Sequence, residues 1–320
     1  LFSIKSAIYL IFKLRKNDLI FYTSAPPYLT FIAYLVSIFK KNKFIIILYD
    51  IYPHILINLK ILSKSSFLVK LWESLNLLAF RKSKALIVLS EEMKEYLYNH
   101  YSRLSGKVKV ITSWANAEEI KPLPRTKNCF IKKHKLESKF VVLYSGNQGR
   151  CHDFDTILNA SLFLKDKKDI VFLFIGNGFK HKIIKDFKDL HNLNNIKLLP
   201  YQDKKDLKFS LASANLALVS IDYNFESLIT PSKIYGHLSI GTPIALICNS
   251  NSFISKLIKN NNLGKQINIG DYKQLINFIL QLKNSEELIN KYNKNCRNYL
   301  LRNASLKVIL KKYLELIEAL

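Results

Sequence analysis

The chain has 320 residues, 49% hydrophobic and 23% charged, so it is long enough for about two globular domains and is too apolar to be disordered. Its formal net charge is +25, which favours an anionic partner such as a membrane surface or a phosphate-bearing substrate. The lysines are scattered, however, and a compositional bias of the source genome also explains them.

The sequence carries no RNA-binding motif, zinc finger or arginine-rich tail, and its longest apolar run, 28–39, is too short to span a membrane. Its four cysteines lack paired spacing, which indicates a reducing compartment and argues against a zinc site.

The first part of the chain alternates short apolar strands with helices, a pattern typical of a parallel sheet covered on both faces. We expect strands at 19–22, 44–49, 85–89 and 108–111, and helices at 28–39, 67–81 and 90–98. The chain begins in a helical pattern over 1–16 without Met, so we expect it to be an N-terminally truncated fragment.

A stretch rich in proline and charge, 116–138, is predicted to be an interdomain linker. A second alternating series follows, typical of a doubly wound domain. We expect strands at 140–144, 170–175, 196–199, 216–221 and 244–247, and helices at 154–164, 180–190, 204–212 and 233–240. The fold class is therefore α/β, with two Rossmann-like domains at 1–118 and 119–300 facing a ligand-binding cleft. The helical tail, 301–320, is long enough to return to the first domain.

The segment TPSKIYGHLSIGTPI, 230–244, places a polar loop before a predicted helix. Thr230 and Ser232 are N-cap candidates, and Gly241 ends the helix. Lys233 lies in the first turn, where free backbone N–H groups and the helix dipole favour an anion such as a diphosphate. A plain helix cap with a surface lysine explains the pattern equally well.

A glycine-rich loop, YSGNQGRCHD at 144–153, follows the first strand of the second domain. Gly146 and Gly149 permit close approach of a ligand, and Arg150 offers a guanidinium suited to phosphate oxygens. The spacing differs from the dinucleotide-binding fingerprint. A second loop, IGNG at 175–178, is more typical of a tight turn than of a ligand contact.

In the first domain, LYDIYP at 48–53 places Asp50 directly after an apolar strand, where its carboxylate either points toward a ligand or braces the loop. The histidines do not have a metal-binding spacing, and no Asp-x-Asp pair ends a strand.

Taken in order, these segments resemble the family 4 retaining glycosyltransferases of the GT-B fold, in particular the bacterial fucosaminyltransferase-like branch of O-antigen and capsule synthesis. The pieces that carry the resemblance are SAPPYL at Ser24, LYDIYP at Leu48, SKALIVLSEEMKEYL at Ser83, VKVITSWANAEEIKPLP at Val108, FVVLYSGNQG at Phe140, DFDTILNA at Asp153, IGNG at Ile175, LLPYQ at Leu198 and TPSKIYGHLSIGTPI at Thr230.

The resemblance implies transfer of a sugar from a nucleoside diphosphate sugar, without a bound metal or cofactor, to an acceptor held by the first domain. Asp50 and Glu226 are then the catalytic candidates at the acceptor hydroxyl and the donor sugar. The implied diphosphate and nucleotide site comprises Gly146, Asn147, Arg150, Thr230, Ser232 and Lys233. His152, Gly176, Tyr201 and Gly236 are weaker candidates for the same site.

The sequence departs from the family pattern at three places. Gly236 stands where the wider family has a ribose-binding Glu. Asn147 and His152 stand where it has Arg and Lys, so either Arg150 substitutes for them or the phosphate is held more loosely. The family's opening strand and glycine-rich loop do not occur after Leu1.

The leading hypothesis is therefore a glycosyltransferase that uses a UDP-linked, N-acetylated deoxysugar or hexosamine. Its acceptor is expected to be a polyprenyl-diphosphate-linked saccharide. The enzyme itself is expected to be cytoplasmic and peripheral on the inner face of the plasma membrane. A sugar-nucleotide epimerase on the same fold and a basic, non-catalytic binding protein are the alternatives.

Overall fold

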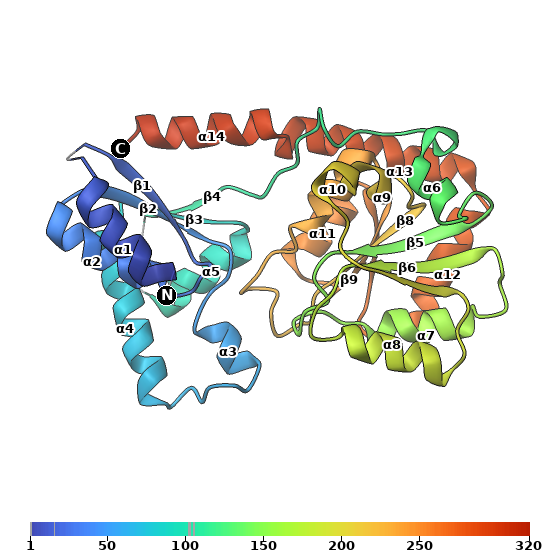
Figure 1. Ribbon diagram of the computed structural model, residues 1–320, viewed down its shortest axis with the longest axis horizontal. Helices are drawn as coiled ribbons and strands as arrows, with labels where there is room; N and C mark the ends of the chain where they lie inside the picture. The colour runs from blue at the N-terminus through green and yellow to red at the C-terminus, as the bar shows by residue number, and fades with distance from the viewer. Residues whose placement is uncertain (1, 16, 102–103, 105) are drawn as a thin grey trace. The chain divides into compact units, whose positions relative to one another are not determined.

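The computed structural model describes residues 2–15, 17–101, 104 and 106–320, which form an α/β structure (Figure 1). Leu1 and Lys16, the two ends of the predicted opening helix, lie outside these residues. The chain divides into two compact units. Unit 1 comprises 1–112, 224–230 and 312–320, and unit 2 comprises 113–223 and 231–311.

Unit 1 contains a four-stranded parallel sheet in the order β1-β2-β3-β4. The strands are β1 Leu19–Thr23, β2 Lys43–Leu48, β3 Ala85–Val88 and β4 Val108–Val110. The helices are α1 Phe2–Lys13, α2 Leu29–Lys40, α3 His54–Asn58, α4 Phe67–Lys82 and α5 Glu91–His100. β2 and β3 are almost continuously apolar and buried, as expected for central strands covered on both faces.

Local signals explain where several helices of unit 1 begin and end. Ser90 caps α5, because its hydroxyl accepts a hydrogen bond from the Met93 amide at 3.3 Å, and Glu91 and Glu92 in the first turn suit the helix dipole. Lys41 ends α2 in the left-handed conformation, with φ of 56°. Because the sheet is parallel, the loops that follow β1 and β2 lie at its carboxyl edge.

Unit 2 contains a six-stranded parallel sheet in the order β10-β9-β8-β5-β6-β7. The strands are β5 Phe140–Ser145, β6 Ile170–Ile175, β7 Ile196–Leu199, β8 Leu216–Ser220, β9 Ile244–Ile247 and β10 Gly264–Ile267. The helices include α6 Cys129–Lys133, α7 Asp155–Phe163, α8 His181–Leu190, α9 Leu207–Leu211, α10 Lys233–Ile240, α11 Phe253–Asn260, α12 Tyr272–Lys283, α13 Glu286–Tyr299 and α14 Leu306–Glu318, the last extending into unit 1.

The sheet of unit 2 has an apolar core on each face, because successive side chains of a strand point to opposite sides. Phe140, Val142 and Tyr144 pack in the core formed with α7, α8 and α12. Val141 and Leu143 pack in the other core, with α6 and α9. Both faces of β5 are thus buried, and its carboxyl end is the first place where polar groups appear.

The structure differs from the predicted elements at four places. The predicted linker 116–138 contains helix α6, whose Phe130 and Ile131 are buried and whose start is capped by Asn128. Ser232 is the N-cap of α10 but makes no side-chain capping bond, because its own backbone is already helical. The helix expected at 204–212 begins as a turn of 3₁₀ helix before α9, and the tail is interrupted by a π-helix, Leu300–Ala304.

Candidate functional site

Two loops at the carboxyl ends of β5 and β6 are hydrogen-bonded to each other. The Gly146 amide donates to the Ile175 carbonyl and the Gln148 amide to the Asn177 carbonyl, both at 2.9 Å. Gly176 has a φ of +127°, and a Cβ added there would lie 2.3 Å from the Gly146 carbonyl oxygen. The glycine of the second loop therefore has a steric role: it permits the first loop to approach this closely.

Lys233 lies beside the first glycine loop, at the start of α10. Its Nζ donates to the Tyr144 hydroxyl at 2.5 Å, lies 3.5 Å from the Asn147 carbonyl oxygen, and is 4.0 Å from the Tyr144 ring centroid. A Cβ added at Gly146 would lie 3.6 Å from its Cε, so the lysine stem covers this glycine.

Burial lowers the pKa of Lys233 to about 7. Within the described ranges no carboxylate forms an ion pair with its Nζ, and the neighbouring oxygens are neutral. A desolvated ammonium without a counter-charge favours an anionic ligand, because such a ligand supplies the missing charge and raises the pKa again.

Arg150 is exposed and stacks on an aromatic ring of the second loop. Its guanidinium carbon lies 3.6 Å from the centroid of Phe179, which is itself 58% exposed. Tyr201, also exposed, donates its hydroxyl to the Asn177 carbonyl at 3.2 Å. These contacts stiffen the rim of the glycine loops and leave the Arg150 donors accessible to phosphate oxygens.

Two histidines of unit 2 are buried and neutral at physiological pH. Burial, together with the charge of Lys233 as a smaller cause, lowers the pKa of His152 and that of His237 to about 3. His152 Nδ1 lies 2.6 Å from the Ser220 carbonyl oxygen, so this ring is held by the backbone. Both ring nitrogens of His237 are buried without a hydrogen-bond partner within the described part of the chain. Gly236 packs near Leu211, whose Cδ1 would lie 3.1 Å from an added Cβ.

The loop 224–230, which connects β8 to α10, belongs to unit 1. Ile229 forms an isolated antiparallel bridge with Asp50, and the Ile51 amide donates to the Leu228 carbonyl at 3.0 Å. Thr230 donates its hydroxyl to Met93 Sδ at 3.5 Å, which explains why it does not cap α10. Glu226 thus belongs to the same unit as Asp50.

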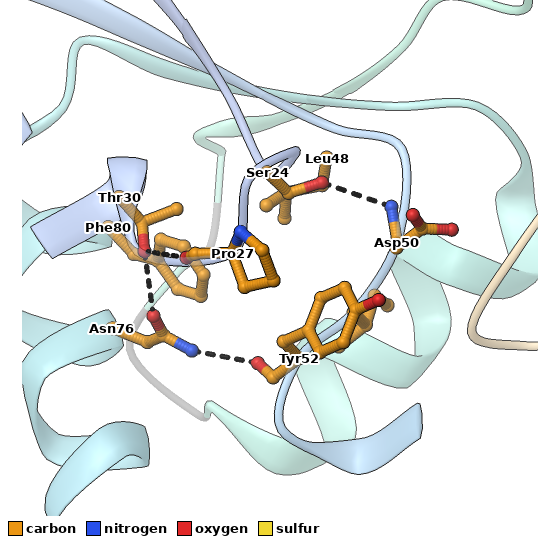
Figure 2. A pocket seen from close by; sticks show the side chains of 9 residues that line it. Ser24, Pro27, Thr30, Leu48, Asp50, Tyr52, Asn76 and Phe80 are labelled. Atoms are coloured by element: carbon orange, nitrogen blue, oxygen red, sulfur yellow. Dashed lines mark hydrogen bonds between the residues drawn. The ribbon is translucent and has the colours of Figure 1, made fainter. Parts of the chain in front are cut away.

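Asp50 lines a pocket of unit 1 with an empty volume of about 230 Å³, including space open to solvent (Figure 2). Its amide donates to the Ser24 hydroxyl at 3.1 Å, and burial raises the pKa of its carboxyl. Asn76 fixes the far wall: its amide nitrogen donates to the Tyr52 carbonyl at 2.8 Å, and its oxygen accepts from the Thr30 hydroxyl at 3.0 Å. Figure 2 shows these bonds around the Tyr52 ring.

The predicted site residues therefore fall into two groups. Unit 2 brings together Gly146, Asn147, Gly176, Tyr201 and Lys233, with Arg150 on Phe179 and with Ser232 at the helix start. Unit 1 holds Asp50, Glu226 and Thr230. Sequence reasoning missed three contributors, Tyr144, Phe179 and His237. Only the position of Tyr144 directly before the glycine loop could have indicated the first of them.

Comparison with known proteins identifies the class. Residues 126–299, more than half of the chain, match the family described as glycosyl transferases group 1, so the chain belongs to this family. It is also similar to the probable glycosyltransferase WbjE of Pseudomonas aeruginosa, with 26% identity over 269 residues. That alignment covers 82% of this chain and 64% of WbjE, so the chain spans less than two thirds of that relative.

Solved structures show the same fold. Anabaena Alr3699/HepE in complex with UDP and glucose superposes with a TM-score of 0.81 at 14% identity, covering 99% of this chain and 81% of HepE. Sucrose-phosphate synthase from Thermosynechococcus elongatus gives a TM-score of 0.76 at 14% identity, over 99% of this chain and 77% of the synthase. The predicted fold class, α/β of the GT-B type with two parallel sheets, is confirmed.

Proposed function

We propose that this chain transfers a sugar from a UDP-sugar to a lipid-linked saccharide during synthesis of a cell-surface polysaccharide. The observation that carries the proposal is Lys233: a desolvated, unpaired cation beside two interlocked glycine loops, at the start of a helix. Such a site fits a diphosphate. Family membership supports the reaction, and the similarity to HepE, which was solved with UDP and glucose, supports uridine as the base.

In the proposed reaction, the bond between the anomeric carbon and the β-phosphate oxygen breaks, and a bond to the acceptor oxygen forms. Negative charge grows on UDP as it leaves, and Lys233 and Arg150 stabilise that charge at the glycine loops. The Gly146 amide is already bonded to Ile175, so the side-chain cations carry this role. The site needs no metal in this scheme; among the described residues no cluster of three metal-ligating side chains occurs.

The acceptor is proposed to use the pocket of unit 1, where Asp50 contacts its hydroxyl group and Glu226 lies on the adjacent loop. The raised pKa of Asp50 suits a carboxylate that takes a proton from a hydroxyl group as the new bond forms. The sugar is proposed to be an N-acetylated deoxysugar or hexosamine, and the acceptor a polyprenyl-diphosphate-linked saccharide at the cytoplasmic, inner face of the plasma membrane. Among the helices of the described residues, none is both long and apolar enough to cross a bilayer.

The epimerase alternative is not favoured by any observation, because the histidine that it needs, His152, is buried against the Ser220 carbonyl. The basic binding protein differs from the transferase in its salt dependence, since purely electrostatic binding is lost as salt rises whereas nucleotide binding in a built site largely persists.

Thermal unfolding with UDP, GDP, ADP and their sugars tests the proposal. We expect UDP and a UDP-sugar to raise the melting temperature, and Lys233→Ala and Arg150→Ala to weaken that shift. Lys256→Ala is the matched control, because this exposed lysine lies on α11, which follows β9, two strands away from β5 in the sheet. Absence of a shift with every nucleotide, in a folded protein, would reject the donor site.

A further inference from the structure

Helix α4 has two apolar faces, although a surface helix normally has one. Asn76 and Phe80, four residues apart, line the pocket of Asp50 in unit 1 (Figure 2), and Trp72 lies one turn before Asn76 on the same side of the helix. The Trp72 ring stacks on the Tyr52 ring, with centroids 6.1 Å apart and an interplanar angle of 7°. This inner face explains the presence of α4 in the fold.

The outer face of α4 is also apolar, and nothing in the described part of the chain covers it. We define it as Phe67, Leu68, Leu71 and Leu78, whose exposed fractions are 76%, 62%, 44% and 41%. Phe67, Leu71 and Leu78 recur at intervals of four and seven, so they lie along one side of the helix. Ile61, in the loop that precedes α4, is also exposed, at 52%. Several large apolar side chains exposed along one side of a helix mark a candidate interaction surface.

The charges around this face have one sign. Residues 59–84 contain six basic side chains and a single acidic one, Glu73. Glu73 lies 3.0 Å from His54 Nε2 and is therefore turned toward α3. Lys60, Lys64 and Lys70, which flank the apolar side chains, are exposed. A second copy of this chain would bring two sets of these lysines together, whereas an anionic lipid surface would neutralise them.

We propose that the outer face of α4, with Lys60, Lys64 and Lys70, docks on an anionic lipid bilayer. Phe67, Leu68 and Leu71 insert among the acyl chains at the interface, and the lysines contact the lipid phosphates. Because the inner face of the same helix lines the pocket of Asp50, docking brings that pocket close to the headgroups. The proposal does not depend on the transfer reaction, since it concerns membrane binding alone.

Vesicle flotation tests the docking surface directly. The full chain is mixed with vesicles of phosphatidylcholine alone or of equal parts phosphatidylcholine and phosphatidylglycerol, at low and high salt. We expect binding to the mixed vesicles, reduced by salt. We expect Phe67→Ser/Leu68→Ser to lower the apparent partition coefficient about tenfold or more, and Lys64→Glu/Lys70→Glu to lower it similarly.

Matched variants separate this surface from general stickiness. Phe163→Ser/Leu190→Ser removes equally exposed apolar side chains, 67% and 75%, from unit 2. Lys256→Glu/Lys259→Glu makes the same change of net charge on α11. Both controls are expected to bind like the original chain, and thermal unfolding verifies that all variants fold. Equal binding by the α4 variants and the controls would overturn the proposal. So would a dimer in light scattering that Phe67→Ser/Leu68→Ser converts to a monomer.

Discussion

Lys233 makes donor binding sensitive to pH. Its pKa is lowered from 10.5 to about 7 by burial, and a bound diphosphate raises it again. The complex therefore holds more protons than the free protein above pH 7, and binding weakens as pH rises. We expect the affinity for UDP, measured by titration calorimetry, to fall by up to about tenfold per pH unit from about pH 7 to about pH 9.

The neutral variant Lys233→Met is the control for this titration. It is expected to bind UDP weakly, with an affinity that changes little over the same range, because the terminal phosphate of UDP, with a second pKa of about 6, is already mostly ionised at pH 7. Lys233 also makes stability depend on pH. Between about pH 7 and the usual pKa of 10.5, the folded protein binds fewer protons at Lys233 than the unfolded chain does. The contribution of Lys233 to the free energy of unfolding therefore rises with pH in that range. A flat affinity profile for the original chain would show that Lys233 does not meet the diphosphate.

Gly176 is expected to be indispensable for stability. Gly176→Ala places a Cβ 2.3 Å from the Gly146 carbonyl oxygen at a φ of +127°, so both the backbone conformation and the loop contact are strained. We expect a loss of about 3 kcal/mol in the free energy of unfolding, measured in urea. Gly270→Ala is the control: its φ is +86° but nothing lies within 4 Å, and it should cost only about 1 kcal/mol. Equal losses would contradict the steric role.

At the scale of elements, Arg125 fastens the segment before α6 to the sheet of unit 2. Its guanidinium donates to four oxygens, those of Ser213, Asn215, Leu136 and Lys139, at 2.9 to 3.1 Å. Arg125→Met would leave these oxygens without this donor, three of them carbonyls. We expect about 3 kcal/mol of destabilisation in urea unfolding, because charged donors contribute more than neutral ones.

Lys127→Met is the matched control, since it removes an exposed cation from the same short 3₁₀ turn. It is expected to change the free energy of unfolding by less than about 0.5 kcal/mol. A similar loss in both variants would mean that net charge, rather than the four hydrogen bonds, determines stability here.

Arg125 also shows why part of the fold was not predictable. Strands such as Ile170–Ile175 and helices such as Lys233–Ile240 follow directly from apolar periodicity and from Gly241. Helix α6 was missed because Pro122, Pro124 and neighbouring charges dominate the local pattern, while its stability depends on partners some 80 to 90 residues away. A local sequence pattern carries no information about contacts between residues so far apart in the chain.

The candidate site divides in the same way. The family resemblance implied that Gly146 and Lys233 share a site. The two residues do lie together, because both follow strands at the carboxyl edge of one parallel sheet. Thr230 donates a hydrogen bond to Met93 instead of capping α10, and Ile229 forms a bridge with Asp50. Both contacts depend on the tertiary packing of the loop 224–230. The sequence therefore indicated which strand ends carry the site, but not which side chains of the connecting loop join each unit.

For the whole molecule, the decisive feature is that each unit has a buried core of its own. β2 and β3 form the centre of unit 1, and β5, β6 and β8 that of unit 2. Compact units with separate cores are able to unfold in separate steps. A ligand that binds only one of them stabilises that step alone. The donor site proposed here lies in unit 2.

The two tryptophans of the chain allow this to be measured, because Trp72 lies in unit 1 and Trp114 in unit 2. Trp114→Phe leaves a fluorescence signal from unit 1, and Trp72→Phe leaves one from unit 2. We expect urea unfolding to give two midpoints, and UDP to raise the one reported by Trp114 while leaving the one reported by Trp72 unchanged. If UDP raises both equally, the two units unfold as one cooperative body or the nucleotide stabilises both. A rise confined to Trp72 would instead assign the nucleotide to the pocket of Asp50, and Lys233 would lose its role in binding the donor.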